Sequence, residues 1–386
     1  MSLPQNAAVE PRSISGQARP LVLVVGLGPA GASAAAAAAA GGCRVIAVDR
    51  RRSVGEPLQC AELVSAAFSV DGVGWDGLTA QPIRCMISAV EQQAPRTNAQ
   101  FYGRMICRPE FDRTLVARAV AQGAHIRLGV SVSRVGADGS VCLSNGERIE
   151  ARVLIGADGP RSVVGSAIGT VNRELVAARQ ITLPLPAPYH ATDIFLRAAY
   201  PGGYGWLFPI GRCAHVGVGL DFAHRHRLKV SVHELQAQLA AQGRVSAAAS
   251  LALTGGLIPA GGRLRCIGRL RSVMVLLAGD AAGLTNPVTG AGIEAAVRSG
   301  ALAGGAAAHW LAGRADAVDD YESELSDLYD GAYGRALRRR RALLDAHARG
   351  RVAAEDLWRG WIASPGYWSE APIGDGQGRC GREMAA

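Results

Sequence analysis

The chain has 386 residues, of which 49% are hydrophobic and 19% are charged, and its formal net charge is +9 at neutral pH. This balance is typical of a globular protein that is long enough for two closely packed domains or for one core with an inserted lobe. The basic residues are dispersed apart from clusters at 50–52 and 338–341, and no aromatic stacking platform accompanies them, so no nucleic-acid binding is predicted. A basic surface favours instead an anionic substrate or cofactor, or the headgroups of an acidic membrane.

The eight cysteines form no C-x-x-C pair, and no Cys/His cluster has the spacing of a zinc site, so no metal site is predicted. The polar segment 1–20 lacks the apolar core of a secretory signal, and no apolar run is long enough to span a membrane. We therefore expect a reduced, cytoplasmic protein. Peripheral contact with the inner face of the membrane stays open.

The first elements of the chain predict a β-α-β unit. Residues 1–20 are predicted to be a disordered leader, and the apolar run 21–26 (LVLVVG) is typical of a buried parallel strand. The alanine-rich stretch 29–40 favours a helix. The apolar run 44–49 (RVIAVD) is predicted to be a second buried strand.

The next segment predicts strands outside that unit, followed by a helix. Residues 83–90 and 99–107 have the pattern of strands in another sheet. Residues 108–123 have helical spacing, with apolar side chains on one side. Several short strands between 125 and 158 are typical of a meander that returns to the first sheet.

The second half of the chain begins with a mainly antiparallel pattern and ends in helices. Residues 172–265 alternate as antiparallel strands do, with one helix predicted over 231–243. The apolar run 273–280 (VMVLLAGD) is again a buried strand that leads into a glycine-rich turn. From about residue 290 the chain is predicted to be mostly helical, with a frayed last dozen residues. Two charged runs are expected on solvated surfaces, at 224–226 and at 338–341.

A glycine-rich turn lies between the first predicted strand and the first predicted helix. The segment G-L-G-P-A-G places Gly26, Gly28 and Gly31 where a tight turn, a close approach to a pyrophosphate and close helix packing exclude side chains. The helix that follows has Ala30 in its first turn and directs partial positive charge at the phosphates. Asp49, at the end of the second strand, is placed to accept hydrogen bonds from a ribose. The turn is therefore predicted to bind a dinucleotide.

Two further segments are typical of nucleotide-binding loops at strand ends. GADGPRS (156–162) contains Asp158, and the segment 276–296 places Asp280 at the carboxyl end of a strand, where open α/β sheets bind ligands. Asp280 is a candidate for hydrogen bonds to ribityl hydroxyls. Taken alone, either segment is equally consistent with a turn whose Asp caps a helix. The backbone amides expected to face the pyrimidine edge of a flavin are those of Gly290, Ala291 and Gly292.

Taken together, the motifs resemble those of the geranylgeranyl reductase family, within the flavoproteins that share the p-hydroxybenzoate hydroxylase fold. The resemblance covers most of residues 20–310 and is specific for the fold and for FAD. One departure is Leu63, because the family commonly has a glycine after the QCAE segment. The motifs, in the order of the family, are the dinucleotide turn, VDR (48–50), PLQCAELVS (57–65), R-x-x-F-D-x-x-L (108–115), ADGPRS (157–162), YGWLFP (204–209) and GDAAGLTNPVTGAGIEAA (279–296).

The resemblance implies contacts with FAD for Arg50, Arg108 and Asp280. It also implies that Cys60 lies near the isoalloxazine ring, and that the YGWLFP motif lines the substrate cavity. The substrate-binding residues expected from this motif are Tyr204, Trp206 and Phe208.

Two residues of the QCAE segment are candidates for catalysis. Reduction of an isolated alkene needs a hydride at one carbon and a proton at the other, and Cys60 is a candidate proton donor or relay. Glu62 is a candidate supporting titratable group. A buried structural cysteine and a locally paired glutamate are the alternatives.

The predicted fold class is α/β, with a Rossmann-type FAD-binding domain, an interleaved antiparallel β-sheet substrate domain and C-terminal helices. The chain is expected to cross between the two domains several times. The predicted boundaries are 21–82, 104–171 and 266–310 for the discontinuous FAD-binding domain, 83–103 and 172–265 for the substrate domain, and 311–386 for the C-terminal helical region.

The first function expected from the resemblance is FAD-dependent reduction of double bonds in a prenyl or isoprenoid substrate, by hydride transfer from the reduced flavin. One alternative is an FAD-dependent monooxygenase that hydroxylates an aromatic ring in a small molecule or a peptide side chain, as other proteins on this scaffold do. The other alternative is a non-catalytic flavin-binding protein. The only dinucleotide fingerprint is assigned to FAD, so the electron donor is expected to be NAD(P)H, bound transiently, or a ferredoxin. The substrate is expected to be apolar or aromatic, with a reductase partner or a peptide substrate left open.

Overall fold

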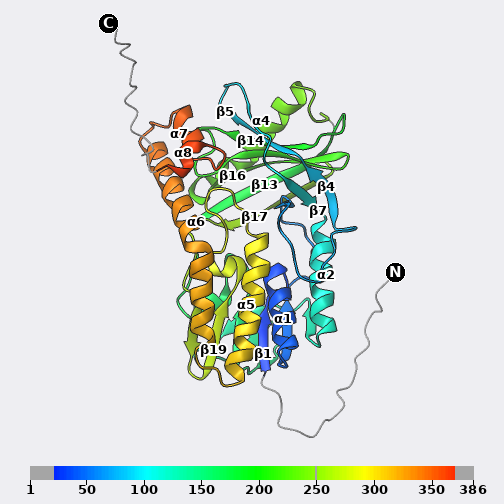
Figure 1. The fold of residues 1–386 in the computed structure, drawn as a ribbon, viewed down its shortest axis with the longest axis vertical. Coiled ribbons are helices and arrows are strands. Elements are labelled where there is room, and N and C mark those ends of the chain that lie inside the picture. Colours follow the sequence, from blue (N-terminus) through cyan, green and yellow to red (C-terminus); the bar gives the residue numbers. More distant parts are fainter. Residues whose placement is uncertain (1–20, 248–249, 370–386) are drawn as a thin grey trace.

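The computed structural model describes residues 21–247 and 250–369. The predicted leader at 1–20 and the predicted frayed tail lie outside the described residues. Figure 1 shows an elongated molecule with one large sheet in its lower half and a second in its upper half. Helix α6 (Ala317–Ala348) runs along the side of both halves (Figure 1).

The lower sheet has six strands in the order β18-β19-β12-β1-β2-β8. All neighbours in it are parallel except the pair β18 and β19, so most strand ends that carry loops to the site lie at one edge. Its central strands are continuously apolar because helices and loops cover both faces. The strands are β1 (Leu21–Val25), β2 (Arg44–Asp49), β8 (His125–Leu128), β12 (Val153–Gly156), β18 (Ile267–Leu270) and β19 (Val273–Leu277).

Two helices rich in small residues pack against each other beside this sheet, α1 (Pro29–Ala40) and α5 (Ile293–Leu311). A Cβ atom at Gly300 would lie 2.0 Å from the carbonyl oxygen of Ala30, and one at Gly304 would lie 2.3 Å from that of Ala34. The two backbones therefore touch. The alanine run of α1 and the glycines of α5 allow this close approach.

The upper sheet has seven strands in the order β17-β13-β16-β15-β14-β5-β6. All neighbours are antiparallel except β14 and β5. One face packs on helix α4 (Leu228–Ala241), and the other faces the apolar cluster that holds Trp206 and Trp361. The strands are β5 (Cys85–Val90), β6 (Arg96–Asn98), β13 (Leu175–Pro184), β14 (Ala191–Leu196), β15 (Gly205–Ile210), β16 (Cys213–Asp221) and β17 (Ala252–Pro259).

Two small sheets complete the fold, and they correct two predicted strands. The predicted strand 83–90 is interrupted at exposed Arg84, where the chain leaves the small sheet and enters the upper one. The predicted strand 99–107 is extended only at its end, because the preceding residues form a loop. An unbroken apolar alternation does not reveal a change of sheet. The small sheets consist of β3 (Leu63–Ser65), β7 (Gly103–Ile106) and β4 (Thr79–Ile83), and of β11 (Arg148–Ile149), β10 (Val141–Leu143) and β9 (Val132–Val135).

The arginines of α6 are not all on a solvated face, which corrects the prediction for 338–341. Arg340 is 2% exposed and forms an ion pair of 2.6 Å with Asp221 at the end of β16. Arg339 is also buried and donates to the carbonyl oxygen of Gly366 at 2.9 Å. The C-terminal segment folds back over α6, and its helices are α7 (Ala354–Arg359) and α8 (Pro365–Trp368).

Three further expectations from the sequence concern the charged run 224–226, membrane-spanning helices and metal sites. Residues 224–226 lie in a short 3-10 turn, η1 (Phe222–Arg227), that has no buried side chain. In the part of the chain that the structure describes, no helix has the length and apolarity needed to cross a membrane. Within the same residues, no group of three or more His, Cys, Asp or Glu side chains is arranged to hold a metal ion.

Candidate functional site

The turn between β1 and α1 has a backbone shape that leaves no room for side chains at two of its glycines. Gly26 has a φ of 95°, and a Cβ atom there would lie 2.2 Å from the carbonyl oxygen of Ala157. A Cβ atom at Gly31 would lie 1.8 Å from the carbonyl oxygen of Gly26. Above Gly28 there is space, since the nearest atom to a Cβ placed there is Nη2 of Arg51 at 3.8 Å. The turn is tight on its inner side and open on its outer side, as a backbone that cradles a pyrophosphate requires.

The two helices beside the turn begin without a side-chain cap. Neither Gly28, before α1, nor Gly292, before α5, offers a side chain to the first-turn amides. In contrast, α3 (Val163–Ala167) is capped, because Ser162 accepts from the amide of Gly165 at 2.7 Å. Among the residues that the structure describes, the first-turn amides of α1 and α5 therefore have no side-chain cap, and they direct partial positive charge toward a ligand.

Asp49 lies at the end of β2, as predicted, but its carboxylate is hydrogen-bonded to a neighbouring arginine. Its Oδ2 accepts from the amide of Leu27 at 2.7 Å and from Nη2 of Arg51 at 2.9 Å, and its Oδ1 accepts from Nε of Arg51 at 3.1 Å. Burial alone would raise the pKa of Asp49, but the hydrogen bonds and charge of Arg51 hold it below its ordinary value. The predicted Arg50 is exposed. Arg51 was missed, since three consecutive arginines in the sequence do not reveal which one turns inward.

Asp158 of the second motif makes the contacts of a helix cap. Its carboxylate accepts from the hydroxyl of Ser162 at 2.5 Å and from the amide of Val163 at 2.7 Å. Burial raises the pKa of this carboxyl despite these hydrogen bonds. The backbone just before it, at Ala157, is the surface against which the dinucleotide turn packs. The segment thus supports the turn from behind.

The third motif lies directly beside the first. Gly279, in the 3-10 turn η2 (Gly279–Ala282), has a φ of 60°, and a Cβ atom there would lie 2.9 Å from Cβ of Ala30. The next residue, Asp280, accepts from the hydroxyl of Thr285 at 3.1 Å through Oδ1, and its Oδ2 makes no hydrogen bond within the described residues. Burial raises the pKa of this carboxyl.

The loop between η2 and α5 is held in shape by one asparagine. Asn286 accepts from the amides of Val288 and Thr289 through its side chain, at 3.0 and 3.1 Å. The loop ends at Gly290, which has a φ of 71°, and at exposed Ala291. This arrangement presents the amides before α5 on the same side as Asp280, because a Cβ atom at Gly292 would lie 3.5 Å from Oδ1 of Asp280.

Arg108, at the start of α2 (Arg108–Ala121), connects the motifs. It pairs with Asp112 one turn later, at 3.1 Å between Nε and Oδ1. Burial alone would lower the pKa of Arg108, but Asp112 and Cys60 beside it raise it above its ordinary value. Its charge also acts on Asp280 and on Arg51. Arg108 is therefore close to residues of all parts of the site.

The QCAE segment contains a buried hydrogen-bonded chain that the sequence did not reveal. Glu62, which is 3% exposed and has a φ of 65°, accepts from Nε2 of His215 or donates to it at 2.8 Å. The other ring nitrogen, Nδ1, lies 3.0 Å from the hydroxyl of Thr182. The second carboxylate oxygen of Glu62 accepts from the amide of Arg108 at 2.9 Å, and the amide of Glu62 donates to Sγ of Cys60 at 3.1 Å. Glu62 thus links the sheet, the helix and the cysteine.

The aromatic residues of YGWLFP lie on the same face of the upper sheet as the hydrogen-bonded side chains of His215 and Glu62. Phe208 is the register partner of His215, and Trp206 lies over Gly217, where a Cβ atom would be 2.2 Å from the indole. Both aromatic side chains are buried within the apolar cluster. Gln180, which the sequence also did not reveal, accepts from the Trp206 indole at 3.3 Å and donates to the carbonyl oxygen of Cys60 at 2.9 Å.

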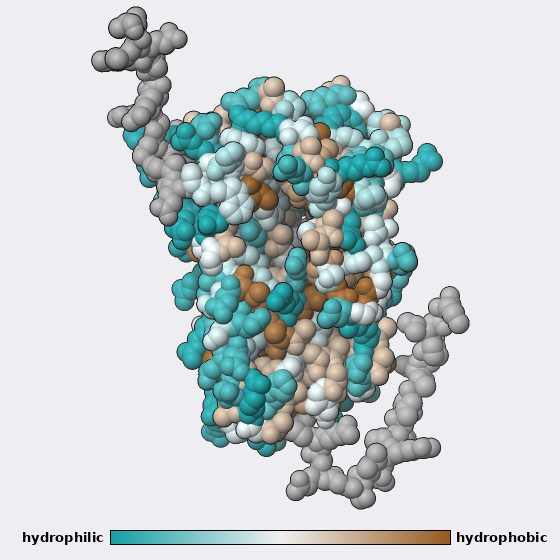
Figure 2. Space-filling model, in the orientation of Figure 1, coloured by the Kyte–Doolittle hydropathy of each residue, from teal (hydrophilic) through white to brown (hydrophobic). Residues whose placement is uncertain are grey.

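Tyr204 lies at the edge of this face, next to the C-terminal segment. Its ring packs edge-to-face on Trp206 and Trp361, at centroid distances of 5.8 and 5.1 Å, and its hydroxyl donates to the carbonyl oxygen of Thr289 at 2.5 Å. A cavity of about 40 Å³ lies beside it, bordered also by Arg340. Figure 2 shows apolar side chains gathered across the middle of the molecule, between the levels of the two large sheets.

The residues at the edge of the lower sheet fit a dinucleotide. The open space above Gly28, the uncapped starts of α1 and α5, and the guanidinium groups of Arg51 and Arg108 match a ligand with two phosphates. Asp280 supplies an acceptor for hydroxyl groups. The site therefore combines donors for anions with the buried carboxylate of Asp280, beside a sulfur atom and an apolar sheet face.

Comparisons with known proteins identify the family of the chain. Residues 79–332 match the family described as "FAD binding domain". Digeranylgeranylglycerophospholipid reductase 2 of Methanopyrus kandleri is 32% identical over 340 residues, which are 82% of this chain and 84% of that protein. The digeranylgeranylglycerophospholipid reductase of Methanocella arvoryzae is 30% identical over 337 residues, 79% of this chain and 82% of that protein.

A solved structure shares the fold. A geranylgeranyl bacteriochlorophyll reductase-like protein from Thermoplasma acidophilum superposes with a TM-score of 0.75 at 22% identity, covering 88% of this chain and 89% of that chain. The α/β fold predicted from the sequence is thereby confirmed. The protein is an FAD-dependent oxidoreductase, and the chain belongs to the geranylgeranyl reductase family of FAD-binding flavoproteins.

Proposed function

We propose that this flavoprotein reduces carbon–carbon double bonds of a prenyl substrate. The observation that carries the proposal is the position of Cys60 and Glu62, which lie against the aromatic face of the upper sheet and next to Arg108. The relatives that align with most of the chain are named as reductases of digeranylgeranylglycerophospholipid. A half-buried thiol beside an apolar face suits a substrate that is itself apolar and needs a proton.

Different groups of residues are proposed to bind different parts of FAD. The dinucleotide turn and the start of α1 are proposed to bind the pyrophosphate, with Arg51 as a counter-charge. Asp280 is proposed to accept hydrogen bonds from ribityl hydroxyls, and the amides before α5 to face the pyrimidine edge. The full proposed set is Gly26, Gly28, Ala30, Gly31, Asp49, Arg50, Arg51, Arg108, Asp158, Asp280, Gly290, Ala291 and Gly292.

When bound and reduced, FAD supplies a hydride to one alkene carbon. Cys60 is proposed to give its thiol proton to the other carbon, so that two new C–H bonds replace the π bond and a thiolate is left. The amide of Glu62 and the charge of Arg108 lie where they stabilise that thiolate. Water returns a proton to sulfur after product leaves. Glu62 is then a positioning residue, because His215 and the amide of Arg108 already engage its carboxylate.

The aromatic face is proposed to exclude water and to align the chain of the substrate. Trp206 and Phe208 are buried, and the indole of Trp206 is fixed by Gln180. Tyr204 closes the edge of the face against Trp361. The aromatic side chains offer a flat apolar surface, which suits an isoprenoid chain.

The electron donor is proposed to be NAD(P)H or a ferredoxin. The basic surface, with a net charge of +9, attracts an acidic reductase or a phosphorylated nicotinamide. Stopped-flow reduction of the flavin by each donor separately tests this proposal. The effective donor is expected to reduce the flavin at least as fast as the enzyme turns over, and failure of both contradicts the proposal.

The proposed reaction is tested by anaerobic incubation of the chemically reduced enzyme with a geranylgeranyl substrate, followed by mass spectrometry. Each bond reduced is expected to raise the product mass by about two units, from one hydride and one proton. A parallel incubation is carried out in air. A product that has gained oxygen there, with no saturated product in either incubation, overturns the proposal in favour of hydroxylation. A flavin that cannot be reduced at all indicates a non-catalytic flavoprotein.

A further inference from the structure

The C-terminal segment (residues 351–369) covers the aromatic face that is proposed to bind the substrate. Leu357 and Trp361 of this segment belong to the same buried apolar cluster as Trp206 and Phe208. Trp361 is 2% exposed, and its ring packs edge-to-face on the ring of Tyr204. The aromatic face is therefore closed by side chains of the segment.

The space beside Trp361 is too small for a prenyl chain. The cavity that borders both Tyr204 and Trp361 has a volume of about 40 Å³. This volume is about that of a single water molecule in the liquid, whereas sites for small molecules have about 300 Å³ or more. Leu357 and Gly360 of the segment also border the cavity. A prenyl chain can therefore lie on the aromatic face only if one wall of this cavity moves away.

The closed packing leaves two buried donors without acceptors. Nε1 of Trp361 and Nε of Arg340 are buried and have no hydrogen-bond partner within the described residues, and both side chains border the small cavity. The N–H group of a buried tryptophan usually finds an acceptor, and a buried donor without one costs free energy. Water would reach both donors if the segment moved away. This gain offsets part of the apolar contact that opening removes.

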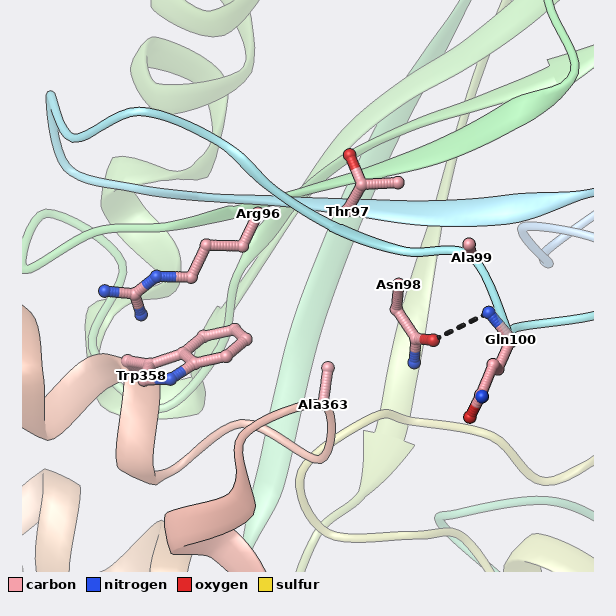
Figure 3. A pocket seen from close by; sticks show the side chains of 7 residues that line it. All are labelled: Arg96, Thr97, Asn98, Ala99, Gln100, Trp358 and Ala363. Atoms are coloured by element: carbon pink, nitrogen blue, oxygen red, sulfur yellow. Dashed lines mark hydrogen bonds between the residues drawn. The ribbon is translucent and has the colours of Figure 1, made fainter.

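The segment is attached to the rest of the molecule by two arginines. Near its far end, Arg339 donates to the carbonyl oxygen of Gly366 at 2.9 Å. At α7, the guanidinium of Arg96 stacks on the indole of Trp358, 4.4 Å from the ring centroid (Figure 3). This second contact lies beside a cavity of about 450 Å³ between residues 96–100, at the sheet edge, and the segment. The cavity leaves α7 room to move on this side.

The opposite wall of the small cavity is held in place. The hydroxyl of Tyr204 donates to the carbonyl oxygen of Thr289 at 2.5 Å, and Arg340 forms its ion pair of 2.6 Å with Asp221. The segment, in contrast, is joined to α6 by residues 351–353, which belong to no helix or strand. Of the two walls, the C-terminal segment is therefore the one that is free to move.

We infer that residues 351–369 form a lid over the aromatic face, and that Trp361 occupies the place that the chain of the substrate takes when the lid opens. The inference rests on the proposed function, since it concerns access to the same site. In the open state, the prenyl chain covers Trp206 and Phe208 in place of Trp361. Opening of the lid then limits how fast the substrate binds.

Hydrogen exchange followed by mass spectrometry tests whether the lid opens. The full-length oxidised holoenzyme is compared with and without geranylgeraniol, at the same detergent concentration. Peptides from residues 353–363 are expected to exchange about tenfold faster with geranylgeraniol bound, because the chain holds the lid open. Peptides from α4, on the other face of the upper sheet, should not change. Unchanged or slower exchange in the lid overturns the inference.

A substitution at Trp361 tests whether its side chain competes with the substrate. Trp361→Leu should raise the second-order rate constant for flavin reoxidation at low geranylgeraniol concentrations about tenfold, since the closed state loses apolar contact. The limiting rate at saturation should stay within about twofold of the wild type, because the lid is then open in both proteins. Single-turnover absorbance of the dithionite-reduced flavin gives both rates. Trp310→Leu, at a half-buried position in α5, is the control and should keep both. A lower second-order rate constant for Trp361→Leu contradicts the inference.

Arg96→Gln is a second variant that leaves the buried cluster intact. It removes the contact with Trp358 at the sheet edge, so the second-order rate constant should rise about threefold. If Trp361→Leu is purified without flavin, Arg96→Gln decides, and an unchanged rate constant overturns the inference. Faster exchange in the lid with no reduction of geranylgeraniol supports the lid and contradicts the proposed reaction. Reduction with unchanged exchange supports the reaction and overturns the lid.

Discussion

The two halves of the molecule form their parts of the site in opposite ways. At the edge of the lower sheet, the site exists because side chains are missing, as at Gly26 and Gly31, where a single Cβ atom would meet backbone at 2.2 and 1.8 Å. On the face of the upper sheet, it exists because particular side chains meet, as Glu62 does with His215 across 153 residues of chain. Backbone geometry is therefore the determinant in one half, and side-chain chemistry is the determinant in the other.

The largest expected effect is that of Gly31→Ala. The added methyl group collides with the backbone of the turn and cannot be accommodated by rotating a side chain, so we expect a loss of at least about 3 kcal/mol of stability and of FAD binding. The measurements are thermal unfolding and the flavin absorbance of the purified protein. Gly305→Ala in α5 is the control, because nothing lies within 4 Å of a Cβ atom there. A Gly31→Ala protein with full flavin content would show that the turn is not limited by backbone contact.

The next effect concerns the upper half, where chemistry is expected to change while the fold stays intact. Cys60→Ser should slow the single-turnover reduction of a prenyl substrate about a hundredfold, as loss of a general acid does, with little change in flavin binding. Stopped-flow absorbance of the reduced flavin measures the rate. Cys142→Ser, in strand β10 of a small sheet outside the site, is the control and should keep the wild-type rate. A Cys60→Ser enzyme as fast as the control would leave the thiol with a structural role only.

The buried pair on the upper sheet should contribute to stability as well. His215→Leu leaves the Glu62 carboxylate without one of its two side-chain or backbone partners, at a cost of about 3 kcal/mol. Glu62→Gln and the double variant complete a cycle measured by urea unfolding. We expect the double variant to be less destabilised than the sum of the single ones, because the two groups interact directly. Strict additivity would mean that the 2.8 Å contact contributes nothing of its own.

The smallest expected effects concern Asp49 and Asp280 in the lower half. In the FAD-free protein, these two carboxyl groups should change the stability in opposite directions as the pH rises. The pKa of Asp49 is lowered when the chain folds, so its stabilisation is present above its ordinary pKa of about 4 and is lost as the pH falls through its folded value. Burial raises the pKa of Asp280, so its ionisation costs stability as the pH rises above about 4. Urea unfolding between pH 3 and pH 7 should therefore show Asp49→Asn less stable and Asp280→Asn more stable near neutrality, each by about 1 kcal/mol.

Both differences should shrink toward pH 3. Asp280→Asn should at the same time bind FAD more weakly, since the proposed acceptor for the ribityl hydroxyls loses its charge. Asp76→Asn, at an exposed position, is the control. If Asp49→Asn and Asp280→Asn changed stability in the same direction across the whole pH range, the opposite electrostatic roles assigned to them would be wrong.

The same contrast explains what could be predicted from the sequence. The dinucleotide turn, the acidic strand end and the α/β fold depend on residues that are close in sequence, and the family resemblance extended them to FAD. His215 and Gln180 gave no local signal, because their partners lie in the segment around Cys60 and are joined to them only by the folded sheet. The inward turn of Arg51 and the burial of Arg340 depend equally on distant neighbours.

The strand order of the lower sheet has a consequence for how the protein is made. Strand β1 pairs with β12, which in turn pairs with β19, and β19 ends only at Leu277. Between them the nascent chain produces most of the upper sheet. A ribosome therefore releases β1 and its neighbour β2 long before β12 and β19 can complete the sheet on the other side of β1, so we expect the lower sheet to close only late in translation. Slowing synthesis after Leu277, rather than before it, should improve the yield of folded flavoprotein.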